Sequence, residues 1–230
     1  MHDFVAWLDQ WQTLISGLLA IIAAIVGAIL LRKQIVQADA HEHSRLRRRL
    51  TAIRATLPLT LSGLGQFVRD IICQLAQARR ALVPGHIGAL RTGFNPPQLP
   101  NHLVDALREI LEATDDKSIV ELISEICCEI QVLNSRIMSL TDQVQMSNLS
   151  NVGETVDQYI IQAARVHALI EALFDFARRN EEKGPDCVSW DRVQSVFNLL
   201  NIHGNEFAGL RRTLEIRMSR LPSAWTMPDQ

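Results

Sequence analysis

The chain has 230 residues, of which 47% are hydrophobic and only 5% aromatic, and its formal net charge is −2. Runs of β-branched residues are scarce and strong helix formers dominate, which argues against a β-sheet fold and favours one helical domain. The small net charge conceals an asymmetry. Residues 32–91 carry 11 Lys and Arg against 3 Asp and Glu, whereas residues 101–182 carry 6 against 15.

After a short head (residues 1–12), residues 13–31 form an apolar segment of 19 residues without a charge. As a helix it is about 28 Å long, close to the ~30 Å hydrocarbon core of a bilayer. A soluble helix of this length needs a polar face, and this segment has none. We therefore predict a transmembrane helix. Its expected interface anchors are four residues that flank the segment: Trp7, Trp11, Arg32 and Lys33.

The distribution of basic residues predicts the topology. No Lys or Arg precedes the apolar segment, and Arg32 and Lys33 follow it at once. By the positive-inside rule the N-terminus lies outside and the body in the cytoplasm. A cleaved signal peptide is the competing interpretation, but it requires a basic start, and this one carries only Asp3 and Asp9. In the reducing cytoplasm the cysteines are expected to be free thiols that pack as small buried hydrophobes: Cys73, Cys127, Cys128 and Cys187.

Small residues recur along the apolar segment at helical spacing. They form two stripes of the kind that lets helix backbones approach closely: Ser16, Ala20, Ala24 and Ala28, with Ala23 and Gly27 alongside. The stripes indicate self-association or pairing with a partner helix. The alternative is that Ala and Gly are simply frequent in membrane helices.

A resemblance to a protein group appears in the same region. The run from Trp11 to Gly17, an Ala-rich span and a basic exit at Lys33-Gln34-Ile35 resemble the head of small uncharacterised bacterial inner-membrane proteins. The resemblance covers about the first 60 residues. It implies a bacterial inner membrane and supplies no activity.

Residues 32–57 are predicted to continue the helix as a basic stalk. The stalk carries a basic patch of five residues: Arg45, Arg47, Arg48, Arg49 and Arg54. The patch reaches anionic lipid if the helix bends over the membrane. Otherwise its natural partner is acidic protein, and we expect it to pack near the surface from Asp105 to Glu129, within one chain or across an oligomer. It has no aromatic neighbours for base stacking, so no nucleic-acid partner is expected.

Residues 58–220 are predicted to form the helical body. Pro58 is expected to open a helix that ends before a Pro- and Gly-rich loop at residues 84–100, and Asn101 to cap the next helix. Apolar residues alternating by four and three then mark two long helices joined by a turn at residues 147–153, an antiparallel hairpin. The first seam is Ile119, Ile123, Ile126, Ile130, Leu133, Ile137, Leu140 and Val144, and the second is Val156, Tyr159, Ala163, Val166, Ile170, Leu173 and Ala177.

Ser189 is predicted to cap a last helix that carries apolar residues as far as Leu214. Gly204 and Gly209 within it mark a close approach or a kink. Residues 221–230 form a polar tail.

No sequence motif nominates a catalytic, cofactor or metal site. His41 and His43 are two residues apart and therefore on different sides of a helix, which does not suit a metal. Glu121, Glu125 and Glu129 repeat every four residues and are read as an outer, solvated face. His167 and His203 are read as packed side chains.

The sequence thus predicts an all-α protein: a single N-terminal transmembrane helix, a stalk and a cytoplasmic antiparallel helical bundle. We expect a non-enzymatic interaction, scaffold or accessory protein without cofactor or metal. Its expected partners are the lipid bilayer and either a second copy or another membrane or cytoplasmic protein. The alternative is an oligomerising membrane sensor or effector whose bundle detects a signal.

Overall fold

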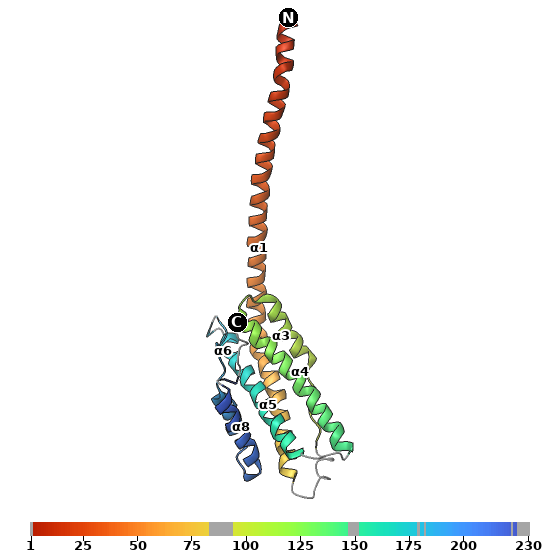
Figure 1. Cartoon of the computed structure of the whole chain (residues 1–230), viewed down its shortest axis with the longest axis vertical. Coiled ribbons are helices and arrows are strands. Elements are labelled where there is room, and N and C mark those ends of the chain that lie inside the picture. The colour runs from red at the N-terminus through yellow and green to blue at the C-terminus, as the bar shows by residue number, and fades with distance from the viewer. Residues whose placement is uncertain are drawn as a thin grey trace. The chain divides into compact units, whose positions relative to one another are not determined.

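The computed structural model describes residues 2–82, 94–146, 152–178, 180–181, 183–221 and 223–224, and within them the chain is all-helical, as predicted (Figure 1). Residues 147–151 of the predicted turn, residues 84–93 of the predicted loop and residues 225–230 of the predicted tail lie outside the described residues. The elements are α1 (His2–Ala81), α3 (Asn101–Ala113), α4 (Lys117–Met146), α5 (Val152–Ala172), α6 (Phe174–Ala177), α7 (Trp190–Leu199), the 3-10 helix η1 (Asn205–Phe207) and α8 (Ala208–Arg220).

The chain divides into two units, Met1–Arg49 and Leu50–Gln230, and the division falls within α1. The described residues of the second unit share a hydrophobic core. This unit begins earlier than the predicted body, because Leu50 and Ile53 already pack against that core and Leu57 is fully buried in it.

The prediction that Pro58 begins a new helix is wrong, because Pro58 lies inside α1. An interior proline removes one backbone hydrogen bond and costs about 3 kcal/mol. The residues on either side of it share one buried face: Leu57, Leu61, Leu64, Val68 and Ile71 are each at most 1% exposed. Burying a side chain of this size contributes about 1.5–3 kcal/mol, so keeping the face in one helical register outweighs the cost of the proline.

Helix α5 lies at the centre of the second unit. Almost every residue from Val156 to Ala172 is at least half-buried, and the helix packs against α4, α7 and α8. A helix that is covered on several sides needs apolar residues beyond one seam, and Ile160, Ile161 and Leu169 of α5 are buried outside the predicted one. The described residues of both seams are buried except Tyr159, which is half-buried. The side chain of Val144 lies outside the described residues.

The helix starts differ from the predictions in one place and agree in another. Asn101 is the first residue of α3 and not its cap; Pro100 holds the cap position without a side-chain hydrogen bond. Ser189 caps α7 as predicted, since its hydroxyl accepts a hydrogen bond from the Asp191 N–H at 3.1 Å. Asp116 caps α4 in the same way, accepting from the Ile119 N–H at 3.1 Å.

The last predicted helix is broken into α7 and α8. Asn201 has a φ of 54°, and the Ile202 N–H donates to the Phe197 carbonyl at 3.0 Å, which is a Schellman ending with Asn in the left-handed position. In α8, a Cβ on Gly209 would lie 3.1 Å from an Asp157 carboxylate oxygen. The predicted close approach at Gly209 is therefore present, between α8 and α5.

Candidate functional site

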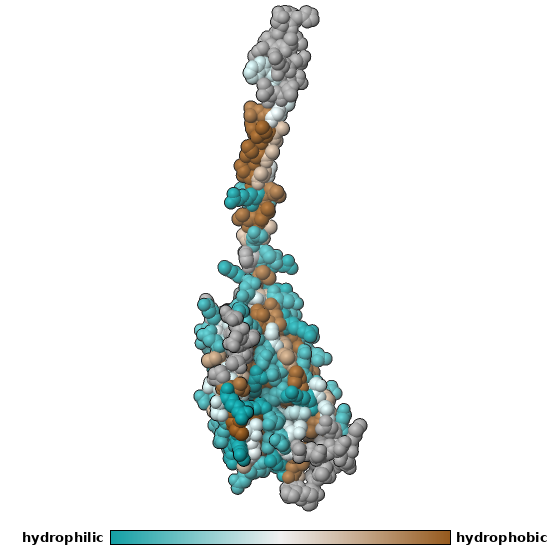
Figure 2. All heavy atoms as spheres, viewed as in Figure 1, coloured by the Kyte–Doolittle hydropathy of each residue, from teal (hydrophilic) through white to brown (hydrophobic). Residues whose placement is uncertain are grey.

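The first candidate is the apolar part of α1 in the N-terminal unit. It is long and apolar enough to cross a membrane, and its most apolar part is not buried by any described residue (Figure 2). Its large side chains are about half exposed or more on every side of the helix: Leu18, Leu19, Ile21, Ile22, Ile25, Val26, Ile29, Leu30 and Leu31. Apolar residues all round a helix require an apolar environment, which protein or lipid can supply.

The predicted association stripe and the anchors lie on the same helix. All six stripe residues are exposed, and a Cβ on Gly27 would meet nothing within 4 Å. Trp11 is 47% exposed, and Arg32 and Lys33 are exposed. The side chain of Trp7 lies outside the described residues.

The structure divides the predicted basic patch. Four members are exposed and belong to the first unit: Arg45, Arg47, Arg48 and Arg49. Arg54 belongs to the second unit, where its guanidinium lies over the Phe176 ring, 4.0 Å from the centroid. It also donates to two backbone carbonyls, those of Phe176 and Glu181. These contacts of Arg54 lie outside the Asp105–Glu129 surface, and packing of the patch near that surface stays a prediction.

The second candidate is a polar network between α4 and α5 that the sequence did not reveal. Arg165 donates to a Glu129 carboxylate oxygen at 2.6 Å and to a Glu125 oxygen at 2.5 Å. Its Nε donates to the Ala224 carbonyl at 2.6 Å. The reading of these glutamates as a solvated face is wrong, because only 32% of the Glu125 side chain and 20% of the Glu129 side chain are exposed.

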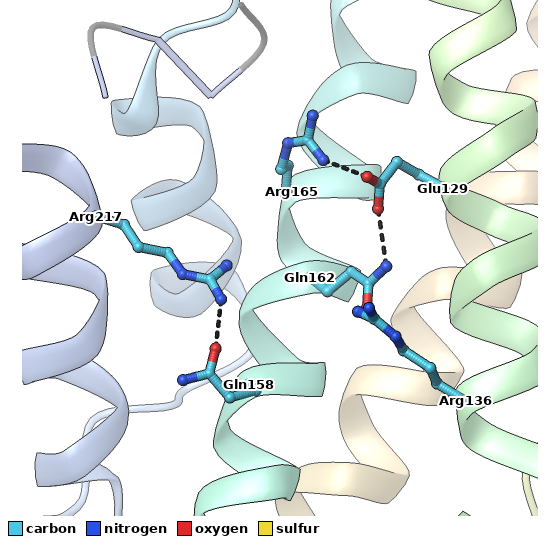
Figure 3. Close-up of a pocket in the computed structure, with 6 residues that line it drawn as sticks. All are labelled: Glu129, Arg136, Gln158, Gln162, Arg165 and Arg217. Atoms are coloured by element: carbon cyan, nitrogen blue, oxygen red, sulfur yellow. Dashed lines mark hydrogen bonds and ion pairs between the residues drawn. The ribbon is translucent and has the colours of Figure 1, made fainter. Parts of the chain in front are cut away.

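This network opens into an arginine pocket, a cavity of about 150 Å³ between α4, α5 and α8 (Figure 3). Its lining consists of Glu129, Arg136, Gln158, Gln162, Arg165 and Arg217. Gln162 is 7% exposed and bridges Glu129 and Arg136. Its amide nitrogen donates to Glu129 at 2.8 Å, and its oxygen accepts from Arg136 at 2.5 Å. Arg217 of α8 donates to the Gln158 oxygen.

Burial lowers the pKa of Arg217, and the neighbouring charges of Arg165 and Arg136 lower it further. The guanidinium groups of Arg136 and Arg165 thus repel that of Arg217 across this pocket. Positive charges held together in a partly desolvated site favour a negatively charged ligand.

A smaller cavity of about 80 Å³ lies beside His167, lined by α1 and by the region from α5 to α6. His167 is packed as predicted, at 2% exposure. Its Nδ1 has no hydrogen-bond partner in the described part of the chain, the nearest Glu171 oxygen being 3.5 Å away. Burial, aided by the charge of Arg69, lowers the pKa of His167 to about 4, so the imidazole is neutral near pH 7.

Two other predictions about side chains are wrong. Cys73, Cys128 and Cys187 are exposed, so these three cysteines do not serve as buried hydrophobes, whereas Cys127 is half-buried and packs against the hydrophobic core. The His203 side chain is exposed; its backbone carbonyl accepts a hydrogen bond from Arg211 at 2.8 Å.

The sequence held a weak signal for the arginine pocket. Gln158, Gln162 and Arg165 are spaced by four and three residues, and Glu129 and Arg136 by seven, so each set shares one helix face. That spacing gives no indication that the two faces meet, and Arg217 comes from a helix far along the chain.

No protein-family model, curated protein or solved structure matches the chain.

Proposed function

We propose that this protein is a single-pass membrane protein whose cytoplasmic helical unit interacts with other proteins, as a scaffold or accessory subunit. The observation that carries the proposal is the apolar segment of α1, which leaves about half of each large side chain exposed. Removing that surface from water is favourable by about 25 cal/mol per Å², and a bilayer offers the matching thickness. On this proposal the second unit is an antiparallel bundle.

The basic residues orient the proposed span. Arg32 and Lys33 directly follow the apolar segment, and residues 1–12 carry Asp3 and Asp9 but no Lys or Arg. The N-terminus then lies outside a bacterial inner membrane and the bundle in the cytoplasm. Alkaline phosphatase or a fluorescent protein fused after Gln230 tests this orientation. We expect cytoplasmic fluorescence, and phosphatase activity would reverse the topology.

The small-residue stripe in the span supports the interaction role, because it allows close helix pairing. Purification of the full chain in mild detergent should yield a homo-oligomer or a stoichiometric partner. A substitution of Ala24 and Gly27 by Leu should disrupt the assembly, whereas the same substitution at Val26 should not. A monomer without a partner contradicts the proposal.

A second function, that of a membrane sensor or effector, is favoured by the arginine pocket. A polar cavity lined by charged groups from three helices offers a place where a cytoplasmic ligand changes the packing of the bundle. Oligomerisation of the span that depends on such a ligand would distinguish a sensor from a scaffold.

A further inference from the structure

We propose that the arginine pocket binds a phosphate group. The site belongs to the helical unit, so the proposal stands whether or not α1 crosses a membrane. The phosphate comes either from a soluble molecule or from a lipid headgroup, since both present the same oxyanion.

The charge balance of the pocket is the first argument. With the Glu125 carboxylate that pairs with Arg165 included, three arginines face two carboxylates around the pocket, the other being that of Glu129. That carboxylate is bonded to Arg165, which also pairs with Glu125. In the described part of the chain, the side chains of Arg136 and Arg217 bond only to neutral amide oxygens, those of Gln162 and Gln158. An anionic phosphate group would give these two guanidinium groups charged acceptor oxygens and would offset the remaining excess of one positive charge.

The partners of the three arginines distinguish structural from ligand-binding roles. Arg165 is fixed by two carboxylates and a backbone carbonyl, as expected of a residue that joins α4 to α5. Arg136 and Arg217 approach from α4 and α8 on the two sides of α5 (Figure 3). Guanidinium groups present several N–H donors in a planar fork, so each of them retains donors for an oxyanion after bonding one glutamine oxygen.

The size and polarity of the cavity also fit. An apolar cavity of about 150 Å³ in another protein accommodates benzene, so a cavity of this volume accommodates a phosphate group. Gln158 accepts from Arg217 through its oxygen, which leaves its amide nitrogen as a further donor.

Thermal unfolding of the full chain in non-ionic detergent tests the proposal, with inorganic phosphate compared with chloride at a constant ionic strength of about 0.15 M. Phosphate at a hundredfold excess over its Kd should raise the Tm by about 5–10 °C. Arg136→Gln and Arg217→Gln should abolish this shift. Arg212→Gln, which removes the same charge from an exposed position on α8, should retain it.

The unfolding of the variants without phosphate separates binding from a structural role. Because Arg217 is half-buried and repelled by two other arginines, Arg217→Gln should leave the Tm in chloride within about 2 °C of the wild type. A large loss in chloride together with an unchanged phosphate shift would make Arg217 structural and overturn the proposal. If the Gln variants do not fold, Arg217→Lys keeps the charge without the planar fork and should weaken phosphate binding about tenfold.

Reconstitution separates the two sources of phosphate. A phosphate shift in phosphatidylcholine discs that requires Arg217 assigns a soluble ligand. A shift produced by added phosphatidic acid that requires Arg217 assigns a lipid headgroup. If neither experiment gives a shift that depends on Arg217, the proposal is overturned.

Discussion

Two parts of α1 have similar residue types and opposite surroundings. Between Leu18 and Leu31 the apolar side chains point to every side of the helix and are about half exposed or more. Between Leu57 and Ala78 most of them lie on one face and are buried, and Leu59 is an exposed exception. The comparison teaches that the angular distribution of apolar residues, more than their number, decides what covers a helix. An apolar face on one side of a helix is buried by packing against the rest of the protein. An apolar surface on all sides is buried only by a bilayer or by partner helices.

The largest expected effect concerns the apolar segment of α1. Replacing Ile22 and Ile25 together by Arg places two charges near the middle of the apolar segment, at about 2.5–3.5 kcal/mol each on the insertion scale. We expect the chain to move from the membrane pellet to the soluble fraction after a carbonate wash. Replacing both residues by Leu is the matched control and should leave the chain in the pellet. Retention of the Arg variant in the membrane would contradict the assignment of a span.

The next largest effect concerns the buried face of α1. Leu64 is fully buried, and Leu64→Ala should lower the free energy of unfolding by about 2–5 kcal/mol. Leu59 lies on the same helix but is 79% exposed, so Leu59→Ala should change it by less than about 0.5 kcal/mol. Urea unfolding of both variants checks this difference. Equal losses would mean that the buried face of α1 is assigned incorrectly.

The buried histidine makes the second unit sensitive to acid. The pKa of His167 is about 4 in the folded chain and 6.5 in its ordinary state, so the unfolded chain binds more protons between these values. The contribution of His167 to the free energy of unfolding is therefore fully present above about pH 6.5. It falls by about 3 kcal/mol as the pH decreases towards about 4. Burial raises the pKa of Glu171, which acts in the opposite direction. Comparison with His167→Leu isolates the histidine.

In that comparison, the wild type should lose about 3 kcal/mol more than His167→Leu over this pH range, measured by urea unfolding at several pH values. If the free energy of unfolding changes with pH equally in the two proteins, protonation of His167 does not destabilise the folded chain, and the prediction is wrong. Arg69 faces the same cavity, so its substitution by Gln should reduce the difference in part.

The sequence was sufficient for features that depend on residue spacing. The burial of Ile119 to Leu140, the α7 cap at Ser189 and the apolar segment all follow from local patterns. Pro58 does not begin a helix, because its local propensity is outweighed by the buried face that continues through it. Asn201 ends α7 by adopting a left-handed conformation, which any Asn in a helical pattern permits but does not require.

The arginine pocket was not predictable for a different reason. Its chemistry arises from three helices meeting, and charges that read as solvated on one helix become partners of another. Glu129 and Arg165 are 36 residues apart, and Gln158 and Arg217 are 59 apart. Spacing along one helix contains no information about such pairs.

The smallest expected effect concerns the basic patch, which the boundary between the two units divides. Arg54 bonds to the carbonyls of Phe176 and Glu181 and lies over the Phe176 ring, whereas Arg48 is exposed and belongs to the first unit. A charge-assisted hydrogen bond to backbone and a cation–π contact together contribute about 1–3 kcal/mol.

Arg54→Gln should therefore lower the free energy of unfolding by about 1–2 kcal/mol, because part of this energy is offset by renewed solvation of a half-buried group. Arg48→Gln, the matched control, should leave it unchanged within about 0.5 kcal/mol. Urea unfolding at low and high salt measures both. The Arg54 loss should persist at high salt, because its partners are carbonyls and a ring and not exposed carboxylates. A loss that disappears at high salt would instead indicate long-range attraction to the acidic region, the interaction expected for the whole patch from the sequence.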